Sequence, residues 1–214
     1  DAIRLKLFPN YSSAIDLAYK FTGNIKTDVA AVMYKFNKRN YDFQLIGGKY
    51  LEKVAIGGGW AGSLKLIGFK GELTYFVPYT SEGDQNMSFS TALDYSWTNG
   101  SYGMVTYLFN STGSNEVVDP TIQTQNVPTA EYLMPAKHNV MANYSYQLSP
   151  ISSINAGLIY GIGQHSFIVF PTYTINLKSN LDLDVIGQFF FQEIPEESFQ
   201  NIGNGLYWRL KMSF

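Results

Sequence analysis

The sequence predicts an all-β fold built from one antiparallel, up-and-down sheet. Apolar and polar residues alternate in segment after segment, which is the two-residue period of a strand with one apolar face. No sustained i, i+3, i+4, i+7 apolar pattern occurs in the 214 residues, so amphipathic helices are not predicted. Most alternating segments reach ten residues or more, about twice the usual strand length of a soluble protein.

The alternation defines thirteen strands in chain order. They cover residues 2–8, 12–21, 27–37, 41–50, 53–62, 67–78, 87–98, 101–111, 138–148, 152–163, 165–178, 180–192 and 204–214. The last segment shows the pattern most clearly, because Trp208 and Leu210 share one face while Arg209 lies on the other. Each strand is therefore expected to have an apolar face and a polar face.

Three of these segments, 41–50, 53–62 and 101–111, alternate less regularly than the others. The first two contain Gly47-Gly48 and Gly57-Gly58-Gly59. Glycine inside a strand marks a bulge or a close approach of another backbone. We therefore expect bulges or close backbone contacts at these two places.

The composition excludes several classes of protein. With 45% hydrophobic and 16% aromatic residues, the chain is not disordered, and no run approaches the ~18 apolar residues of a membrane helix. There is no cysteine and there are two histidines, which leaves no thiol chemistry and little material for a zinc site. A net charge of −2 provides no footprint for nucleic acid. We therefore expect no cofactor, no metal and no nucleic-acid partner.

The apolar faces are predicted to meet lipid. An alternating sheet either buries its apolar face against another sheet or exposes it to hydrocarbon around a closed barrel. The strand length matches the ~9–11 residues of a tilted membrane strand. Only 15% of residues are charged, against about 25% in soluble domains. The fold class is therefore a transmembrane antiparallel up-and-down β-barrel, about 12–14 strands in this chain, with a soluble β-sandwich or calyx as the alternative.

Aromatic residues and loop lengths indicate how such a barrel would be oriented. If residue 214 is periplasmic, down strands end in aromatic residues at Tyr34, Phe36, Tyr95, Trp97, Tyr144, Tyr146 and Phe214. Up strands end in aromatic residues at the outer rim, at Tyr19, Phe21, Tyr75, Phe189 and Phe191. Short connections then fall on the periplasmic side, whereas the long ones, 79–86, 112–137 and 193–203, all point outward. Two aromatic belts and this asymmetry are expected of an outer-membrane barrel.

The C-terminal strand carries a family resemblance. It ends in Phe214, preceded at alternate positions by Trp208, Leu210 and Met212. This pattern resembles the terminal assembly signal of Gram-negative outer-membrane β-barrel (porin-like) proteins, although Arg209 stands where that signal often has glycine. The resemblance implies an integral location in the bacterial outer membrane and contact with its lipid and lipopolysaccharide. It also implies insertion by the barrel assembly machinery.

The odd number of strands is a problem for a complete barrel. Single-chain bacterial barrels generally have an even number of strands. Either one strand is over-counted, or segment 2–8 is not a membrane strand, or residues 1–214 form the C-terminal portion of a larger barrel. In the last case, the missing N-terminal strands lie upstream or in a partner protein. Because segment 2–8 alternates cleanly, the explanation that residues 1–214 are the C-terminal portion of a larger barrel is about as well supported as the other two together.

Charged residues on the polar faces are the candidates for lining a lumen. They are Asp16, Lys20, Lys35, Asp42, Lys70, Glu72, Asp94, Asp182, Asp184, Arg209 and Lys211. The simplest interpretation is a hydrated or mutually paired wall, and the alternative is electrostatic tuning of ion selectivity. Because both signs occur, no strong preference for anions or cations is predicted.

Neighbouring charges raise two narrower expectations. Lys70 and Glu72, two residues apart on one face, are expected to form a local charge pair. Asp182 and Asp184 could hold a cation, although hydrated carboxylates are the simpler interpretation. The same two interpretations apply to the loop acids Glu82, Asp84, Glu193, Glu196 and Glu197.

Catalysis is the weakest alternative. A barrel hydrolase would place a serine and a histidine together on the lipid-facing side near the outer rim. His165 and Ser166 are adjacent and point to opposite faces of a strand, which leaves Ser166 with His138. We therefore expect no enzyme, but a porin-like channel for passive diffusion of small hydrophilic solutes. The alternative is a plugged, structural barrel that is a subunit of an outer-membrane complex.

Overall fold

The computed structural model describes residues 1–81, 83–118, 128–194 and 198–213, and in these ranges it forms strands and no helices. No helix in the described chain is long and apolar enough to cross a membrane. The strands are β1 (Ala2–Asn10), β2 (Ser13–Lys20), β3 (Val29–Lys38), β4 (Tyr41–Tyr50), β5 (Lys53–Leu64), β6 (Ile67–Pro78), β7 (Asn86–Ser96), β8 (Tyr102–Asn110), β9 (His138–Ser149), β10 (Ser152–Ile162), β11 (Ser166–Lys178), β12 (Leu181–Glu193) and β13 (Phe199–Met212). The thirteen predicted strands are confirmed within two residues at each end, except that β13 begins at Phe199 instead of 204.

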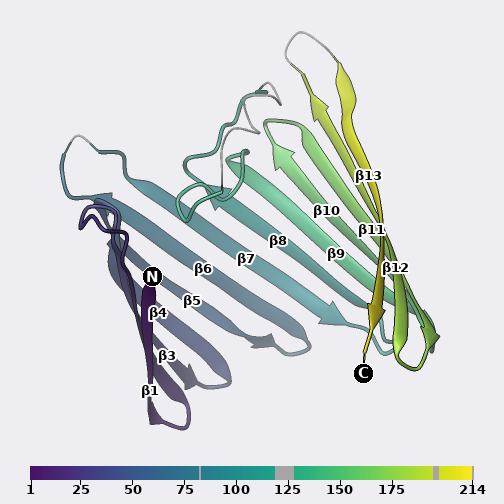
Figure 1. The fold of residues 1–214 in the computed structure, drawn as a ribbon, viewed down its shortest axis with the longest axis horizontal. Coiled ribbons are helices and arrows are strands. Elements are labelled where there is room, and N and C mark those ends of the chain that lie inside the picture. The colour runs from purple at the N-terminus through teal and green to yellow at the C-terminus, as the bar shows by residue number, and fades with distance from the viewer. Residues whose placement is uncertain (82, 119–127, 195–197, 214) are drawn as a thin grey trace.

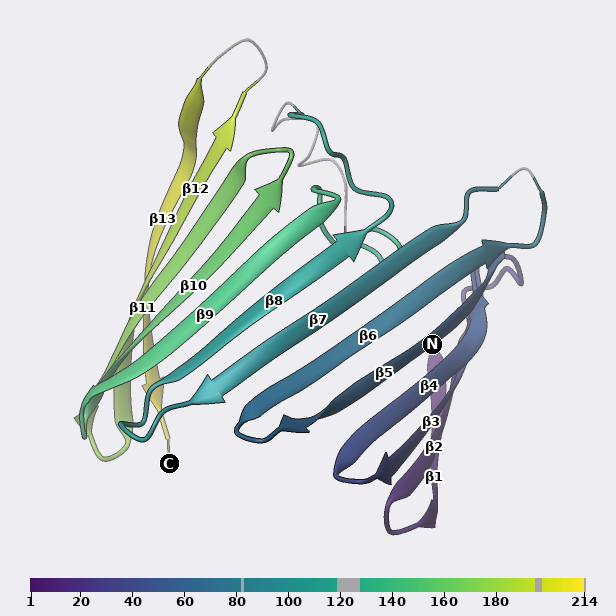
Figure 2. The same ribbon diagram turned by 180° about the vertical axis from the view of Figure 1, so that it is seen from behind.

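Every strand pairs with its neighbours in the chain, so the sheet runs from β1 to β13 in sequence order. Figure 1 shows the sheet curved into a trough, with its concave face toward the viewer and β1 and β13 at its two edges. Figure 2 shows the convex face. Among the described residues, β1 pairs with β2 and β13 with β12, and the two edge strands do not pair with each other. The antiparallel up-and-down sheet is thus confirmed, whereas closure into a barrel remains a prediction.

The two ends of the trough differ in their connections. At one end, called the turn end, short turns such as 11–12, 39–40 and 65–66 join the strands. Arg39 and Asn40 have positive φ angles of 53° and 63°, as a two-residue type I′ hairpin turn requires. At the other end, called the loop end, lie the long connections, including 111–137.

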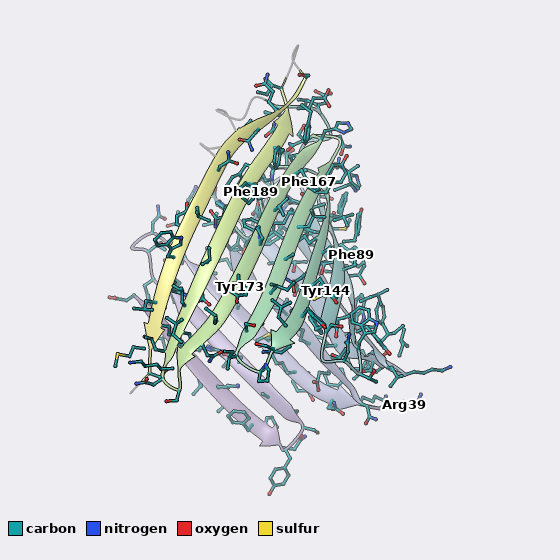
Figure 3. All side chains as sticks on the ribbon, turned by 90° about the vertical axis from the view of Figure 1, so that its right-hand side faces the viewer. Arg39, Phe89, Tyr144, Phe167, Tyr173 and Phe189 are labelled. Carbon is teal, nitrogen blue, oxygen red and sulfur yellow. The ribbon has the colours of Figure 1, made fainter. Side chains whose placement is uncertain are left out.

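Most of the apolar side chains lie on the convex face, and few of those described lie in an interior core. Of the described hydrophobic residues, only Phe76, Leu108 and Ala136 are buried. Figure 3 looks onto the convex face over β9–β13, with Phe167 and Phe189 toward the loop end and Tyr144 and Tyr173 toward the turn end. The concave face is formed by the opposite, mostly polar residues of each strand.

The glycine-rich stretches of β4 and β5 do not form bulges, because the registers of β3–β4, β4–β5 and β5–β6 are uninterrupted. The expected close approach does occur at Gly48, where any side chain would collide with the Ala30 carbonyl. Other glycines make room for aromatic rings on the neighbouring strand, as Gly71 does for Trp60. The register shifts lie instead in β1–β2, β9–β10, β11–β12 and β12–β13.

Candidate functional site

The strand register places all eleven predicted lumen residues on the concave face. They are Asp16 and Lys20 of β2, Lys35 and Asp42 of β3 and β4, Lys70 and Glu72 of β6, Asp94 of β7, Asp182 and Asp184 of β12, and Arg209 and Lys211 of β13. By their positions in the strands, these charged residues lie toward both edges of the sheet and toward the turn end of β3–β7. Their role in lining a lumen remains a prediction, but their common face is a property of the sheet.

One arginine on each edge strand pairs with an aspartate of the neighbouring strand. Arg4 Nε donates to Asp16 Oδ1 at 2.8 Å, and Arg209 Nε donates to Asp184 Oδ2 at 2.7 Å. Thr174 Oγ1 donates to the other carboxylate oxygen of Asp184 at 2.7 Å. Both aspartates are buried, and each arginine covers its partner from the edge strand. Both carboxylate oxygens of Asp184 thus accept hydrogen bonds from neighbouring strands, and the two aspartates have a structural role.

Two expectations about neighbouring charges are corrected by these contacts. Lys70 pairs across the sheet with Asp94, with Nζ 2.9 Å from Oδ2, rather than with Glu72 on its own strand. The Asp94 carboxylate lies over Gly68, where a side chain would block it. Asp182 accepts a hydrogen bond from Asn176 Nδ2 at 2.8 Å. In the described part of the chain, no group of three or more histidine or acidic residues is arranged to hold a metal.

A groove of about 530 Å³ crosses the concave face of β3–β7 near the turn end. Charged and amide side chains form its walls, namely Lys35, Asp42, Gln44, Lys70 and Glu72. Its floor consists of small residues, Gly59, Ala61, Ser90 and Ala92. The groove is therefore a concave space with charges of both signs around it.

The segment between β8 and β9 does not simply project from the loop end. Figure 1 shows its described parts, 111–118 and 128–137, in front of β7 and β8, on the concave side of the sheet. Ala130 and Leu133 line a cavity of about 360 Å³ together with Thr74, Phe76 and Ser88 of the concave face. The second half of this long loop therefore folds back over the concave face, while the extracellular location of the loop remains a prediction.

Glu131 ties this segment to two strands. Its Oε2 lies 2.6 Å from Lys53 Nζ of β5 and accepts a hydrogen bond from Asn86 Nδ2 of β7 at 2.6 Å. Its backbone carbonyl accepts a hydrogen bond from Thr112 Oγ1, also at 2.6 Å. The Lys53 and Glu131 side chains are both mostly buried, so this ion pair is shielded from solvent and screened less than a surface pair.

Buried amide side chains hold residues 134 and 135 near the end of the segment. Asn110 Nδ2 donates to the Met134 carbonyl at 2.9 Å, and Gln164 Nε2 donates to the Pro135 carbonyl at 3.0 Å. Both amides are almost fully buried and must find such partners. Sequence reasoning missed this network because amides carry no charge signal. The one feature of the sequence that could have indicated this network is Glu131, an acidic residue in a Thr- and Pro-rich connection.

The concave face is not uniformly polar. Near the loop end, Met141, Ile159, Ile168 and Phe190 are consecutive cross-strand partners on β9–β12. Phe170 packs edge-on against Phe190, with ring centroids 6.4 Å apart and an interplanar angle of 88°. An apolar patch therefore lies on the same face as the charges, at the other end of the strands.

The residues considered for catalysis do not form a pair. Ser166 faces the concave side opposite Gly161, whereas His138 faces the convex side opposite Phe109. The His138 ring contacts Tyr107, with Nδ1 2.7 Å from the tyrosine hydroxyl. His165 Nδ1 lies 3.2 Å from the Tyr160 hydroxyl. Ser166 and His138 therefore cannot act together as nucleophile and base.

The residues of the predicted assembly signal can be placed in part. Trp208, Leu210 and Met212 share the convex face of β13 and are well exposed. Phe214 lies outside the described residues, as do Glu82, Glu196 and Glu197 of the predicted acidic loops.

The sheet thus combines a convex apolar face with a concave face that carries charges, a groove and an inward-folded segment. No protein-family model, curated protein or solved structure matches this chain.

Proposed function

We propose that this chain forms the wall of a transmembrane β-barrel in the bacterial outer membrane. The observation that carries the proposal is the exposed convex face. Ile56, Leu93 and Val105 are 58%, 50% and 55% exposed, and they belong to a face that continues over all thirteen strands. Removing one such side chain from water stabilises the protein by about 1.5–3 kcal/mol. Monomeric soluble proteins rarely leave so large an apolar area in contact with water. Hydrocarbon is the environment that stabilises this face.

Aromatic contacts on the convex face support the membrane assignment. Near the turn end, Phe36 stacks on Phe43, with ring centroids 5.4 Å apart. Near the loop end, the Phe167 and Phe191 rings lie 6.4 Å apart. Aliphatic residues such as Leu93 lie between these two zones. Aromatic belts at two levels with an aliphatic band between them are the arrangement expected at two membrane interfaces.

The strand lengths suit a bilayer. The twelve residues of β6 extend about 40 Å. A tilt of about 45° reduces this span to roughly 28 Å, close to the ~30 Å thickness of the hydrocarbon core. Strands of this length are therefore long enough to cross the membrane and to reach both interfaces.

A bilayer also requires the two sheet edges to be paired, because unpaired backbone groups cannot be hydrated in hydrocarbon. Figure 1 shows β1 and β13 on opposite sides of the trough. With thirteen antiparallel strands, β1 and β13 run in the same direction. Antiparallel closure therefore needs an odd number of further strands between them. We propose that these come from upstream sequence or from a partner chain.

The proposed barrel is a porin-like channel for passive diffusion of small hydrophilic solutes. Its lumen is the concave face, where Lys35 and Glu72 are exposed to solvent. The described residues 128–137, which fold back over the concave face, narrow the path from the loop end. Selectivity is then a matter of pore width and of the charges that line it.

Planar-bilayer recording of the natural protein, with all its strands and partners, tests this function. A water-filled lumen is expected to give stable unit currents with weak selectivity between K⁺ and Cl⁻, because charges of both signs line the wall. Incorporation of folded protein without unit currents would contradict the channel.

The inward-folded segment favours one second candidate, a plugged barrel that serves as a structural subunit of an outer-membrane complex. Glu131 anchors the segment over the concave face, and the patch around Ile168 and Phe190 presents apolar surface for a plug. A plugged barrel would insert into the bilayer and remain silent, so the same recording separates the two functions.

A further inference from the structure

We propose that the groove near the turn end binds short zwitterionic solutes of the di- and tripeptide class. The proposal rests on the channel function argued above and names the solute that this part of the lumen selects. Four residues on four successive strands carry it: Lys35, Gln44, Gly59 and Glu72.

These four residues form one row across the sheet. Lys35 is the register partner of Gln44, Gln44 of Gly59, and Gly59 of Glu72. Because neighbouring strands lie about 4.8 Å apart, the Cα atoms of Lys35 and Glu72 are separated by about 14 Å of sheet. An ammonium group and a carboxylate thus stand on opposite sides of the groove.

The floor between the two charges offers one kind of polar group. Gly59 has no side chain, and the amide of Gln44 covers the space that a Cβ would occupy, with Nε2 3.0 Å away from that position. Ala61 and Ala92 continue the floor and cannot hydrogen-bond through their side chains. A primary amide, which both donates and accepts, therefore lies between the ammonium and the carboxylate.

The charges of Lys35 and Glu72 are available to a solute. Both residues are exposed, and within the described ranges neither takes part in an ion pair. By contrast, Lys70 is paired with Asp94, and Asp42 accepts a hydrogen bond from Asn37 Nδ2 at 2.8 Å. The groove consequently offers one uncommitted positive charge and one uncommitted negative charge.

This arrangement discriminates among solute classes. A simple anion or cation meets one attractive and one repulsive group. An uncharged sugar gains only hydrogen bonds, for example with Gln44 and Ser90. A peptide zwitterion of two or three residues spans about 7–10 Å between its terminal groups. It can direct its carboxylate to Lys35, its ammonium to Glu72 and its peptide bond to Gln44.

Swelling of proteoliposomes in isotonic triglycine or glucose tests the proposal with probes of similar size. Triglycine is expected to enter faster than glucose through the unaltered protein. Lys35→Met and Glu72→Gln should each lower the ratio of the triglycine rate to the glucose rate by up to about fivefold, because one exposed ion pair changes a binding constant by about that factor. The double variant should bring the two rates together. Lys211→Met is the matched control, because it removes a charge from the same face outside the groove.

The outcomes separate the binding proposal from the channel. If neither solute enters, the channel function fails and the groove has no role in transport. If glucose enters and triglycine is no faster, the channel stands and the zwitterion site is overturned. An equal effect of Lys211→Met and Lys35→Met would also overturn it, because the effect would then belong to the overall charge of the lumen. Titrating the ion current with triglycine checks affinity directly, and its half-blocking concentration should rise about fivefold in Glu72→Gln.

Discussion

At the residue scale, burial separates structural charges from available ones. Asp16 and Asp184 are buried and covered by arginines, whereas Lys35 and Glu72 are exposed and unpaired in the described structure. A buried carboxylate needs a partner because desolvation penalises its charge. An exposed charge has no such requirement and can serve a solute instead.

Asp28, in the loop before β3, is the clearest structural charge outside the strands. Its carboxylate accepts hydrogen bonds from the Tyr19 hydroxyl at 2.5 Å and from the Thr22 N–H at 2.8 Å. Lys49 Nζ donates to the Asp28 carbonyl at 2.9 Å and to the Ile25 carbonyl at 2.5 Å. Lys49 is therefore a cap for the loop backbone.

These contacts predict a pH-dependent loop. The hydrogen bond from Tyr19, followed by that from the Thr22 backbone, lowers the pKa of Asp28 below its usual value. Because the folded-state pKa is the lower one, the stabilisation is complete above the unfolded pKa of about 3.9 and is lost as pH falls through the folded value. The difference in unfolding free energy between the unaltered protein and Asp28→Asn should be largest at neutral pH and shrink in acid. A difference that stays constant down to acid pH would show that the charge of Asp28 is not what stabilises the loop.

At the element scale, the described parts of the segment between β8 and β9, 111–118 and 128–137, are held by side chains from several strands as well as by a β-bridge between Ser114 and Ala136. Lys53 comes from β5, Asn86 from β7 and Asn110 from β8. Glu131 is the point where two of these contacts meet. These side-chain contacts add to backbone hydrogen bonds such as those that join Ser114 to Pro135 and Lys137.

Replacing Glu131 should release the segment without unfolding the sheet. In Glu131→Gln, Lys53 loses its anionic partner in a mostly buried place, and a charged hydrogen bond of this kind contributes about 1.5–3 kcal/mol. Amide hydrogen exchange at 129–134 is expected to become about tenfold faster or more, while exchange in β5 and β7 stays unchanged. Glu116→Gln is the control, because Glu116 is an exposed acid of the same segment. If the two variants exchange at the same rate, Glu131 is not the anchor.

At the scale of the whole molecule, the trough has two faces that require two different surroundings. Neighbouring residues of one strand belong to different faces, as Ala92 and Leu93 of β7 do. The described hydrophobic residues supply almost no interior core, so the stability of the sheet depends on what covers the convex face. The proposed lipid environment would thus be needed for the stability of the sheet as well as for its function.

Cysteine substitution tests this two-faced arrangement, since residues 1–214 contain no cysteine. In lipid vesicles, a water-soluble maleimide should label Ala92→Cys and Thr106→Cys on the concave face. Leu93→Cys and Val105→Cys on the convex face should stay unlabelled until the protein is unfolded, because hydrocarbon excludes the reagent. Equal labelling of each neighbouring pair in folded protein would contradict a convex face that is covered by lipid.

The strands were largely predictable because alternation is a local property of each segment. The bounds of 41–50 and 67–78 are reproduced without change in β4 and β6. The early start of β13 was not predictable, because 199–203 lacks clear alternation and pairs with β12 beyond a register shift at Phe190 and Phe191.

For the candidate site, side-chain alternation alone was sufficient to put the eleven charges on one face, because the face of a residue depends only on its position in its own strand. Their partners were decided by tertiary structure: Lys70 pairs with Asp94 because β6 and β7 meet in one particular register. The same holds for Glu131, whose partners lie 45 and 78 residues away in the chain. Alternation between apolar and polar residues is a property of a few neighbouring positions in the sequence, so it can be recognised without the tertiary structure. Contacts between distant segments depend on register and curvature, which no single segment contains.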